Sequence, residues 1–193
     1  MAEPRPVPST EPAMNDRRML LRGAASLVLA WLTPIRSDAQ SPGPTVAAGD
    51  LLVRVGDASL IPITPDDVPF DGRALLVWPL SGDIARDNTP LNKIVVARLN
   101  PTGLSEATRA RAVDDIVAYS AVCTHSGCEV DEAIGESQTL FCSCHGSTFD
   151  PRDSGLAIGG PAPRALPPLP LKLEGGRLAV AAPFLTTPGF GVF

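Results

Sequence analysis

The chain has 193 residues, enough for one domain of ordinary size with shorter segments attached. Apolar residues make up 44% and charged residues 19%, so wholesale disorder is not expected, and 21 prolines with 17 glycines argue against a helix bundle. The net charge of −5 provides no basic surplus to neutralise phosphates, so we expect no nucleic-acid partner.

A paired arginine precedes a short apolar stretch near the N-terminus. Arg17 and Arg18 are followed by Met-Leu-Leu, and residues 23–35 carry no charge. As a helix this stretch would reach only about 20 Å, less than the roughly 30 Å of a membrane core. The segment 1–39 resembles a twin-arginine export signal cleaved after Ala39; an uncleaved anchor and a short buried helix are the alternatives. We therefore expect a periplasmic location or attachment to the periplasmic face of the inner membrane.

The rest of the chain has the pattern of a small β domain. Residues 40–49 are predicted to be a linker, followed by a domain over 50–193. Strands are predicted at 51–55, 74–80, 93–99 and 116–122, with a closing hairpin of 171–173 and 177–180. A helical turn or two is predicted from Ser105 through Ala112, and residues 81–92 are predicted to be a loop. Short strands separated by Gly and Pro favour an all-β sandwich or barrel.

All four cysteines and both histidines lie in a window of 23 residues. They form two boxes, Cys-Thr-His-Ser-Gly-Cys at 123–128 and Cys-Ser-Cys-His-Gly-Ser-Thr-Phe-Asp at 142–150. Thiolates and imidazoles favour zinc, copper or an iron–sulfur cluster, and six such groups exceed the four that tetrahedral zinc needs. Two cysteines and two histidines suit a diiron cluster, which leaves two cysteines for a disulfide. A zinc knuckle or a pair of plain disulfides is the alternative.

The two boxes, together with Gly-Pro-Ala-Pro at 160–163, resemble those of Rieske [2Fe–2S] proteins of the disulfide-bearing subclass found in cytochrome bc complexes. The resemblance implies a Rieske-type antiparallel β sandwich or barrel with a cluster-binding subdomain inserted at about 120–163. It implies one [2Fe–2S] cluster, with Cys123 and Cys142 on the buried iron and His125 and His145 on the outer iron. It also implies a disulfide between Cys128 and Cys144.

Five further residues are expected around the cluster: Ser147, Gly127, Gly146, Phe149 and Pro161. By resemblance, the Ser147 hydroxyl donates to a bridging sulfide and Pro161 belongs to a loop that shields the cluster. The two glycines keep the loops thin near the sulfides. Phe149 stands where high-potential members of the family usually have a tyrosine, so we predict a potential below the highest Rieske values.

The implied function is one-electron transfer, as the iron–sulfur subunit or carrier of an exported or membrane-associated respiratory chain, similar to quinol–cytochrome c reductase. Such a chain is not an enzyme on its own. The alternative is the small Rieske subunit of a periplasmic molybdenum oxidase such as arsenite oxidase. The implied partners are a redox donor and acceptor, either a cytochrome c- or c1-like protein or a molybdenum enzyme, within a membrane complex in some cases. A Rieske oxygenase needs a further 2-His-1-carboxylate site, and no histidine remains to build one.

Overall fold

The computed structural model describes residues 45–70, 73–130 and 138–191, all within one compact unit, Ala39–Phe193. The expected export signal over 1–39 and the first half of the expected linker, 40–44, lie outside the described residues. Among the residues that the structure describes, no helix combines the length and the apolar character needed to cross a membrane.

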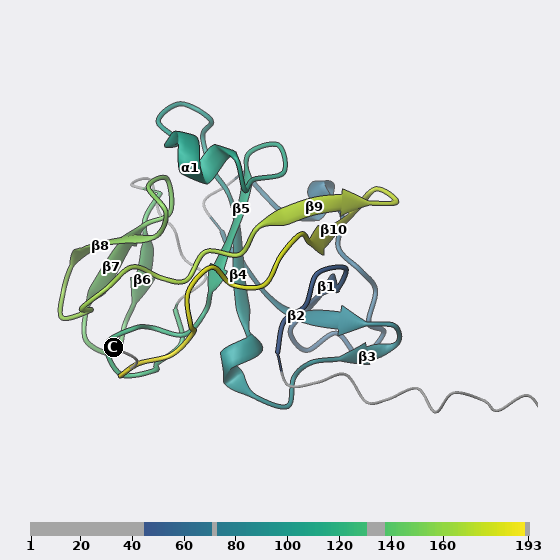
Figure 1. The fold of residues 1–193 in the computed structure, drawn as a ribbon, viewed down its shortest axis with the longest axis horizontal. Helices are drawn as coiled ribbons and strands as arrows, with labels where there is room; N and C mark the ends of the chain where they lie inside the picture. The colour runs from purple at the N-terminus through teal and green to yellow at the C-terminus, as the bar shows by residue number, and fades with distance from the viewer. Residues whose placement is uncertain (1–44, 71–72, 131–137, 192–193) are drawn as a thin grey trace, which may run out of the picture. The chain divides into compact units, whose positions relative to one another are not determined.

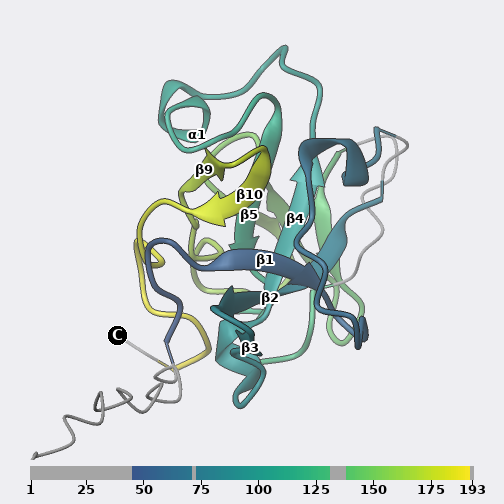
Figure 2. The ribbon, with the colours of Figure 1, turned by 90° about the vertical axis from the view of Figure 1, so that its right-hand side faces the viewer.

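The larger of two antiparallel sheets forms the base of the domain (Figure 1). Its strands are β1 (Leu51–Arg54), β2 (Leu75–Ser81), β3 (Ile84–Ala85), β4 (Ile94–Arg98), β5 (Ile116–Ser120), β9 (Leu171–Glu174) and β10 (Arg177–Val180). The order is β5-β4-β2-β1-β10-β9, with β3 paired to β2, and Figure 2 shows β1 between β10 and β2. The N-terminal and C-terminal parts of the domain thus meet at the β1–β10 pair, and the predicted β9–β10 hairpin is confirmed.

Alternation along the central strands places a core cluster on each face of this sheet. In β4, Val95 and Ala97 belong to one cluster, whereas Ile94 and Val96 belong to the other. Successive side chains of a strand point to opposite faces, so a run of buried β-branched residues fits a strand covered on both sides. The cluster with Val95 also contains Cys123 and Cys142, which places the cysteine boxes against one face of the base sheet.

A second, three-stranded sheet lies between β5 and β9 in the sequence and carries the second cysteine box. It consists of β6 (Leu140–Cys142), β7 (Ser147–Asp150) and β8 (Leu156–Gly159) in the order β6-β7-β8. Cys142 pairs with Ser147, so the first part of the box, residues 143–146, forms the turn of the β6–β7 hairpin. All pairs in both sheets are antiparallel, and the all-β class is confirmed.

Three short helical segments complete the described elements: η1 (Pro65–Asp67), η2 (Pro90–Asn92) and α1 (Glu106–Arg109). The Ser105 hydroxyl accepts from Thr108 N at 3.2 Å, so the predicted cap of α1 is present. The prediction of a plain loop over 81–92 is wrong, because this stretch contains β3 and η2. Gly82, with φ of +58°, makes the tight turn that returns the chain to pair with β2.

Candidate metal centre

Each cysteine box is closed by its own backbone hydrogen bond, and the two bonds are of the same type. Gly127 N donates to Cys123 O at 2.9 Å in the first loop, and Gly146 N donates to Cys142 O at 3.0 Å in the second. Gly127 has φ of +82° and Gly146 has φ of +76°, a region that residues with a Cβ rarely adopt. The glycines therefore permit the turn itself, and each turn presents a histidine two or three residues after its leading cysteine.

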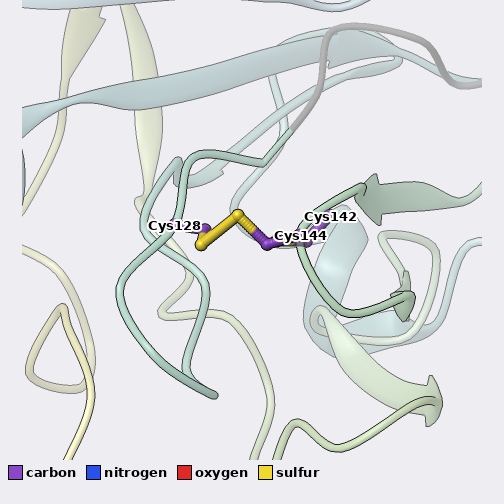
Figure 3. Close-up of side chains that lie close together, drawn as sticks. All are labelled: Cys128, Cys142 and Cys144. Atoms are coloured by element: carbon purple, nitrogen blue, oxygen red, sulfur yellow. A yellow bond between two sulfur atoms is a disulfide. The ribbon is translucent and has the colours of Figure 1, made fainter.

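A disulfide between Cys128 and Cys144 joins the two loops, and Figure 3 shows it beside Cys142. These are the two cysteines to which the family resemblance assigned this bond. The sulfur atoms of Cys128, Cys142 and Cys144 lie within 4.8 Å of one another, but the two bonded sulfurs are not thiolates and offer poor metal ligands. Cys123 and Cys142 are present as buried thiols, which leaves them as the sulfur donors.

The two histidines approach each other from opposite loops. The ring centroids of His125 and His145 are 4.7 Å apart and the planes meet at 84°. His145 is exposed and His125 is partly buried. Ser126 bridges toward the second loop, with its Oγ 3.5 Å from His145 Nδ1 and 3.8 Å from Cys128 Sγ. The thiols thus lie in the core and the imidazoles lie toward the surface.

Two buried polar atoms of the described residues have no hydrogen-bond partner, His125 Nδ1 and Ser147 Oγ. An unsatisfied buried group costs about 1–3 kcal/mol, so such atoms mark a place where a further group binds. Two thiols, two imidazoles and a hydroxyl donor form the donor set of a His₂Cys₂ [2Fe–2S] cluster with a hydrogen bond to its sulfur. The residues present therefore fit the expected cofactor.

The Gly-Pro-Ala-Pro segment at 160–163 lies directly on the second loop. A Cβ built on Gly160 would lie 2.5 Å from Gly146 O and 2.6 Å from Ser147 Cα. Pro161 itself is exposed. At the end of the segment, Thr124 Oγ1 donates to Arg164 O at 2.7 Å, which ties the first loop to the same segment. The segment 160–164 therefore contacts both boxes, the second through Gly160 and the first through Arg164.

The far end of the small sheet is fastened to the base by Tyr119, and beside this contact Asp150 forms a local ion pair with Arg152. Tyr119 donates to Pro151 O at 2.6 Å, and burial raises the pKa of Tyr119 to about 12. Burial acts to raise the pKa of Asp150, but hydrogen bonds from Arg152 and its charge prevail and hold it below the ordinary value. Phe149 is fully buried opposite Leu140 and provides packing without a donor.

The structure brings the expected site residues together, while their role as cluster ligands stays a prediction. Sequence reasoning missed Thr124, Ser126 and Arg164 as residues that connect the loops. Thr124 and Ser126 stand inside the first box, so their position was a usable signal. A groove of about 550 Å³ lies elsewhere, lined by residues of η2 and of 183–188, and contains none of the expected ligands.

Comparison with known proteins identifies relatives over most of the chain. Residues 64–170 match the family model of the Rieske [2Fe-2S] domain. A putative respiratory nitrate reductase Rieske subunit of Haloferax mediterranei is 33% identical over 164 residues, which cover 83% of this chain and 70% of that protein. The cytochrome bc1 complex Rieske iron–sulfur subunit of Streptomyces coelicolor is 32% identical over 169 residues, 79% of this chain and 47% of that protein.

Among solved structures, the plasma membrane Rieske protein of Synechocystis is similar, with 27% identity and a TM-score of 0.42 over 62% of this chain and 95% of that one. In length, the matched region covers less than half of the Streptomyces bc1 subunit and most of the Haloferax protein.

Proposed function

Since this chain belongs to the Rieske [2Fe-2S] domain family, we propose that it is a one-electron carrier whose single cluster is held by Cys123, His125, Cys142 and His145. One observation carries the proposal. Two buried thiols and two imidazoles converge from two disulfide-linked loops, and His125 Nδ1 is buried there with no partner among the described residues. A zinc knuckle would leave the two-loop disulfide and the orphaned hydroxyl of Ser147 without a purpose.

The proposed ligands differ in exposure: the two cysteines are buried, whereas His145 is exposed. A bound [2Fe–2S] cluster supplies reversible one-electron chemistry. Cys123 and Cys142 hold their side of the site in the core, whereas exposed His145 offers an edge that a redox partner can contact. The Ser147 hydroxyl is available to donate toward a cluster sulfur, which stabilises added negative charge. Phe149 has no such donor, so we propose a potential below the top of the family range; a midpoint at that top would contradict this.

We propose that the carrier serves an exported or membrane-associated respiratory chain, as the iron–sulfur subunit of a bc1-like complex. The chain would not catalyse a reaction on its own. The proposed organisation is a twin-arginine signal over 1–39, a linker over 40–49 and the Rieske domain over 50–193, with the cluster on the periplasmic side. Relatives named as subunits of the cytochrome bc1 complex support this assignment.

A second candidate is the small Rieske subunit of a periplasmic molybdenum oxidase such as arsenite oxidase. The Haloferax relative, named as a nitrate reductase subunit, favours a partner other than a bc1 complex, because the match covers 70% of that protein rather than 47%. Purification from native membranes and periplasm, with partners identified by mass spectrometry, separates the candidates. A cytochrome partner supports the first and a molybdenum enzyme supports the second.

The cluster assignment is tested by metal analysis and electron paramagnetic resonance of protein purified anaerobically. We expect two irons and two sulfides per chain and a reduced spectrum with the low average g value of His₂Cys₂ ligation. His145→Ala removes a proposed ligand and should abolish the signal. Cys128→Ser is the control, because it removes a disulfide cysteine and no proposed ligand, and it should leave a cluster that is assembled but fragile. Colourless protein with zinc as its metal, or indifference to both changes, would overturn the proposal.

A further inference from the structure

The C-terminal segment 183–191 returns from β10 toward the loops of the metal centre (Figure 1). Its aromatic residue, Phe190, reaches the first loop. A Cβ built on Gly127 would lie 2.7 Å from Phe190 Cδ1 and 2.8 Å from Cε1, so the ring edge lies against the Gly127 backbone. Gly127 stands between His125 and the disulfide cysteine Cys128, where its N–H closes the turn by donating to Cys123 O at 2.9 Å.

Arg164 fastens this segment to the metal centre. Its guanidinium donates to Thr187 O at 2.9 Å and to Gly189 O at 2.5 Å. Its own carbonyl accepts from Thr124 Oγ1, so one residue connects the first loop to the C-terminal segment. Hydrogen bonds from a charged donor are about twice as strong as neutral ones, and they fix the backbone on both sides of Pro188.

The segment is held at separate points rather than buried along its length. The groove of about 550 Å³ runs along 183–188, and Leu185 is 52% exposed. Leu185 N donates to Pro168 O at 3.0 Å, and Leu91 lies beside Gly189. Phe190 is itself 60% exposed, so only one side of its ring is covered. Phe184 packs against a core cluster at the start of the segment, and Gly189 is buried near its end. The hydrogen bonds of Arg164 and the ring contact of Phe190 hold that end against the first loop.

We propose that Phe190 is a positioning residue for the first ligand loop and that Arg164 holds it in place. The ring shields the Gly127 N–H bond to Cys123 from water on one side. A shielded hydrogen bond is stronger because the local dielectric is lower. The closed turn fixes the direction of the backbone that carries His125. The expected shift of the midpoint potential depends on the proposed ligand role of His125. The positioning of the turn by Phe190 does not depend on that role.

The test uses the full chain with its cluster and measures hydrogen exchange of the Gly127 amide. We expect Phe190→Ala to raise the exchange rate about tenfold, because local opening is no longer opposed by the ring contact. Phe190→Tyr keeps the ring and should exchange like wild type. Leu185→Ala is the matched control, because it truncates an apolar side chain of similar exposure in the same segment, one that lines the groove. This control should leave the exchange unchanged.

A second variant and a second measurement decide the outcome. Arg164→Ala should raise the Gly127 exchange rate as well, and the double variant should be no faster than the faster single one, because both changes release the same contact. The midpoint potential should shift in Phe190→Ala and not in Leu185→Ala. Equal exchange in Phe190→Ala and wild type, or an equal effect of Leu185→Ala, would overturn the proposal. In protein whose reduced spectrum shows His₂Cys₂ ligation, faster exchange with an unchanged potential would also overturn the proposal, since Phe190 would then stabilise the turn without positioning His125. Hydrogen exchange of Gly127 is measured without any redox partner. Its result is therefore independent of which partner is identified.

Discussion

Replacing Gly160 by alanine should separate the segment at 160–163 from the loop of the second cysteine box. Gly160 has φ of +75°, and its added Cβ would meet Gly146 O at 2.5 Å and Ser147 Cα at 2.6 Å. Both neighbours are backbone atoms, so neither can move aside by a change of rotamer. The left-handed conformation costs about 1–2 kcal/mol for alanine, and forcing atoms into a packed contact adds about 1–3 kcal/mol. The expected total loss of stability is therefore about 2–5 kcal/mol.

Gly176→Ala is the matched control for the backbone part of this cost. Gly176 has φ of +78° in the β9–β10 turn, and no atom lies within 4 Å of its added Cβ. We expect it to lose about 1–2 kcal/mol and to retain the cluster as wild type does. A chain of this size loses roughly 2–4 °C of melting temperature per kcal/mol. Gly160→Ala should therefore melt about 2–12 °C below Gly176→Ala, the range that about 1–3 kcal/mol of steric cost gives.

The assay follows thermal unfolding by circular dichroism and cluster loss by visible absorbance at one fixed temperature. We expect Gly160→Ala to bleach faster than Gly176→Ala, because the segment at 160–163 no longer lies on the loop that carries His145. Equal melting temperatures and equal bleaching rates for the two variants would refute the reasoning. That result would mean that the contact between Gly160 and the second loop does not exist in solution.

Three further predictions test other parts of the centre. Cys128→Ser opens a bond between cysteines 16 residues apart and should lower the free energy of unfolding by roughly 3 kcal/mol in a denaturant titration; full stability would contradict it. Ser147→Ala removes a buried hydroxyl and should lower the midpoint potential in a redox titration, with an unchanged potential as the contrary outcome. Burial acts to raise the pKa of Asp150, yet Arg152 holds it below the ordinary 3.8, so its stabilisation is present at neutral pH and lost as pH falls through the lowered pKa. Asp150→Asn should therefore be less stable than wild type at pH 7 and approach it in strong acid, as measured by urea midpoints; a constant gap would contradict this.

The sequence was most informative where one residue type dictates local geometry. The boxes at 123–128 and 142–150 place cysteine, histidine and glycine at spacings that only tight turns accommodate, and the structure has those turns. The short apolar runs with strand character at 93–99 and 116–122 likewise predicted β4 and β5 to within a few residues. In both cases the information is local, so it can be read without knowledge of the fold.

The parts that were missed depend on contacts between distant residues. Strands β6 and β7 are short and interrupted by the second box, so no alternating pattern of useful length exists there. The pair of β2 and β3 was missed because a two-residue strand has no periodicity. Arg164 and Gly189 meet across 25 positions, and the acceptor is a backbone carbonyl that every residue possesses. Such a contact leaves no trace in composition or spacing.

The two buried thiols that we propose as ligands pack together with residues of the base sheet, so the proposed centre should be sensitive to changes in the interior of the domain. Cys123 and Cys142 belong to one buried cluster with fully buried Leu140 and Leu166. Interiors are packed as densely as organic crystals, so a missing methylene anywhere in this cluster alters the surroundings of the sulfur atoms. Optical and magnetic spectra of the centre should therefore register substitutions made far from any iron. A library of core variants can accordingly be ranked for packing by colour alone, before a single unfolding curve is recorded.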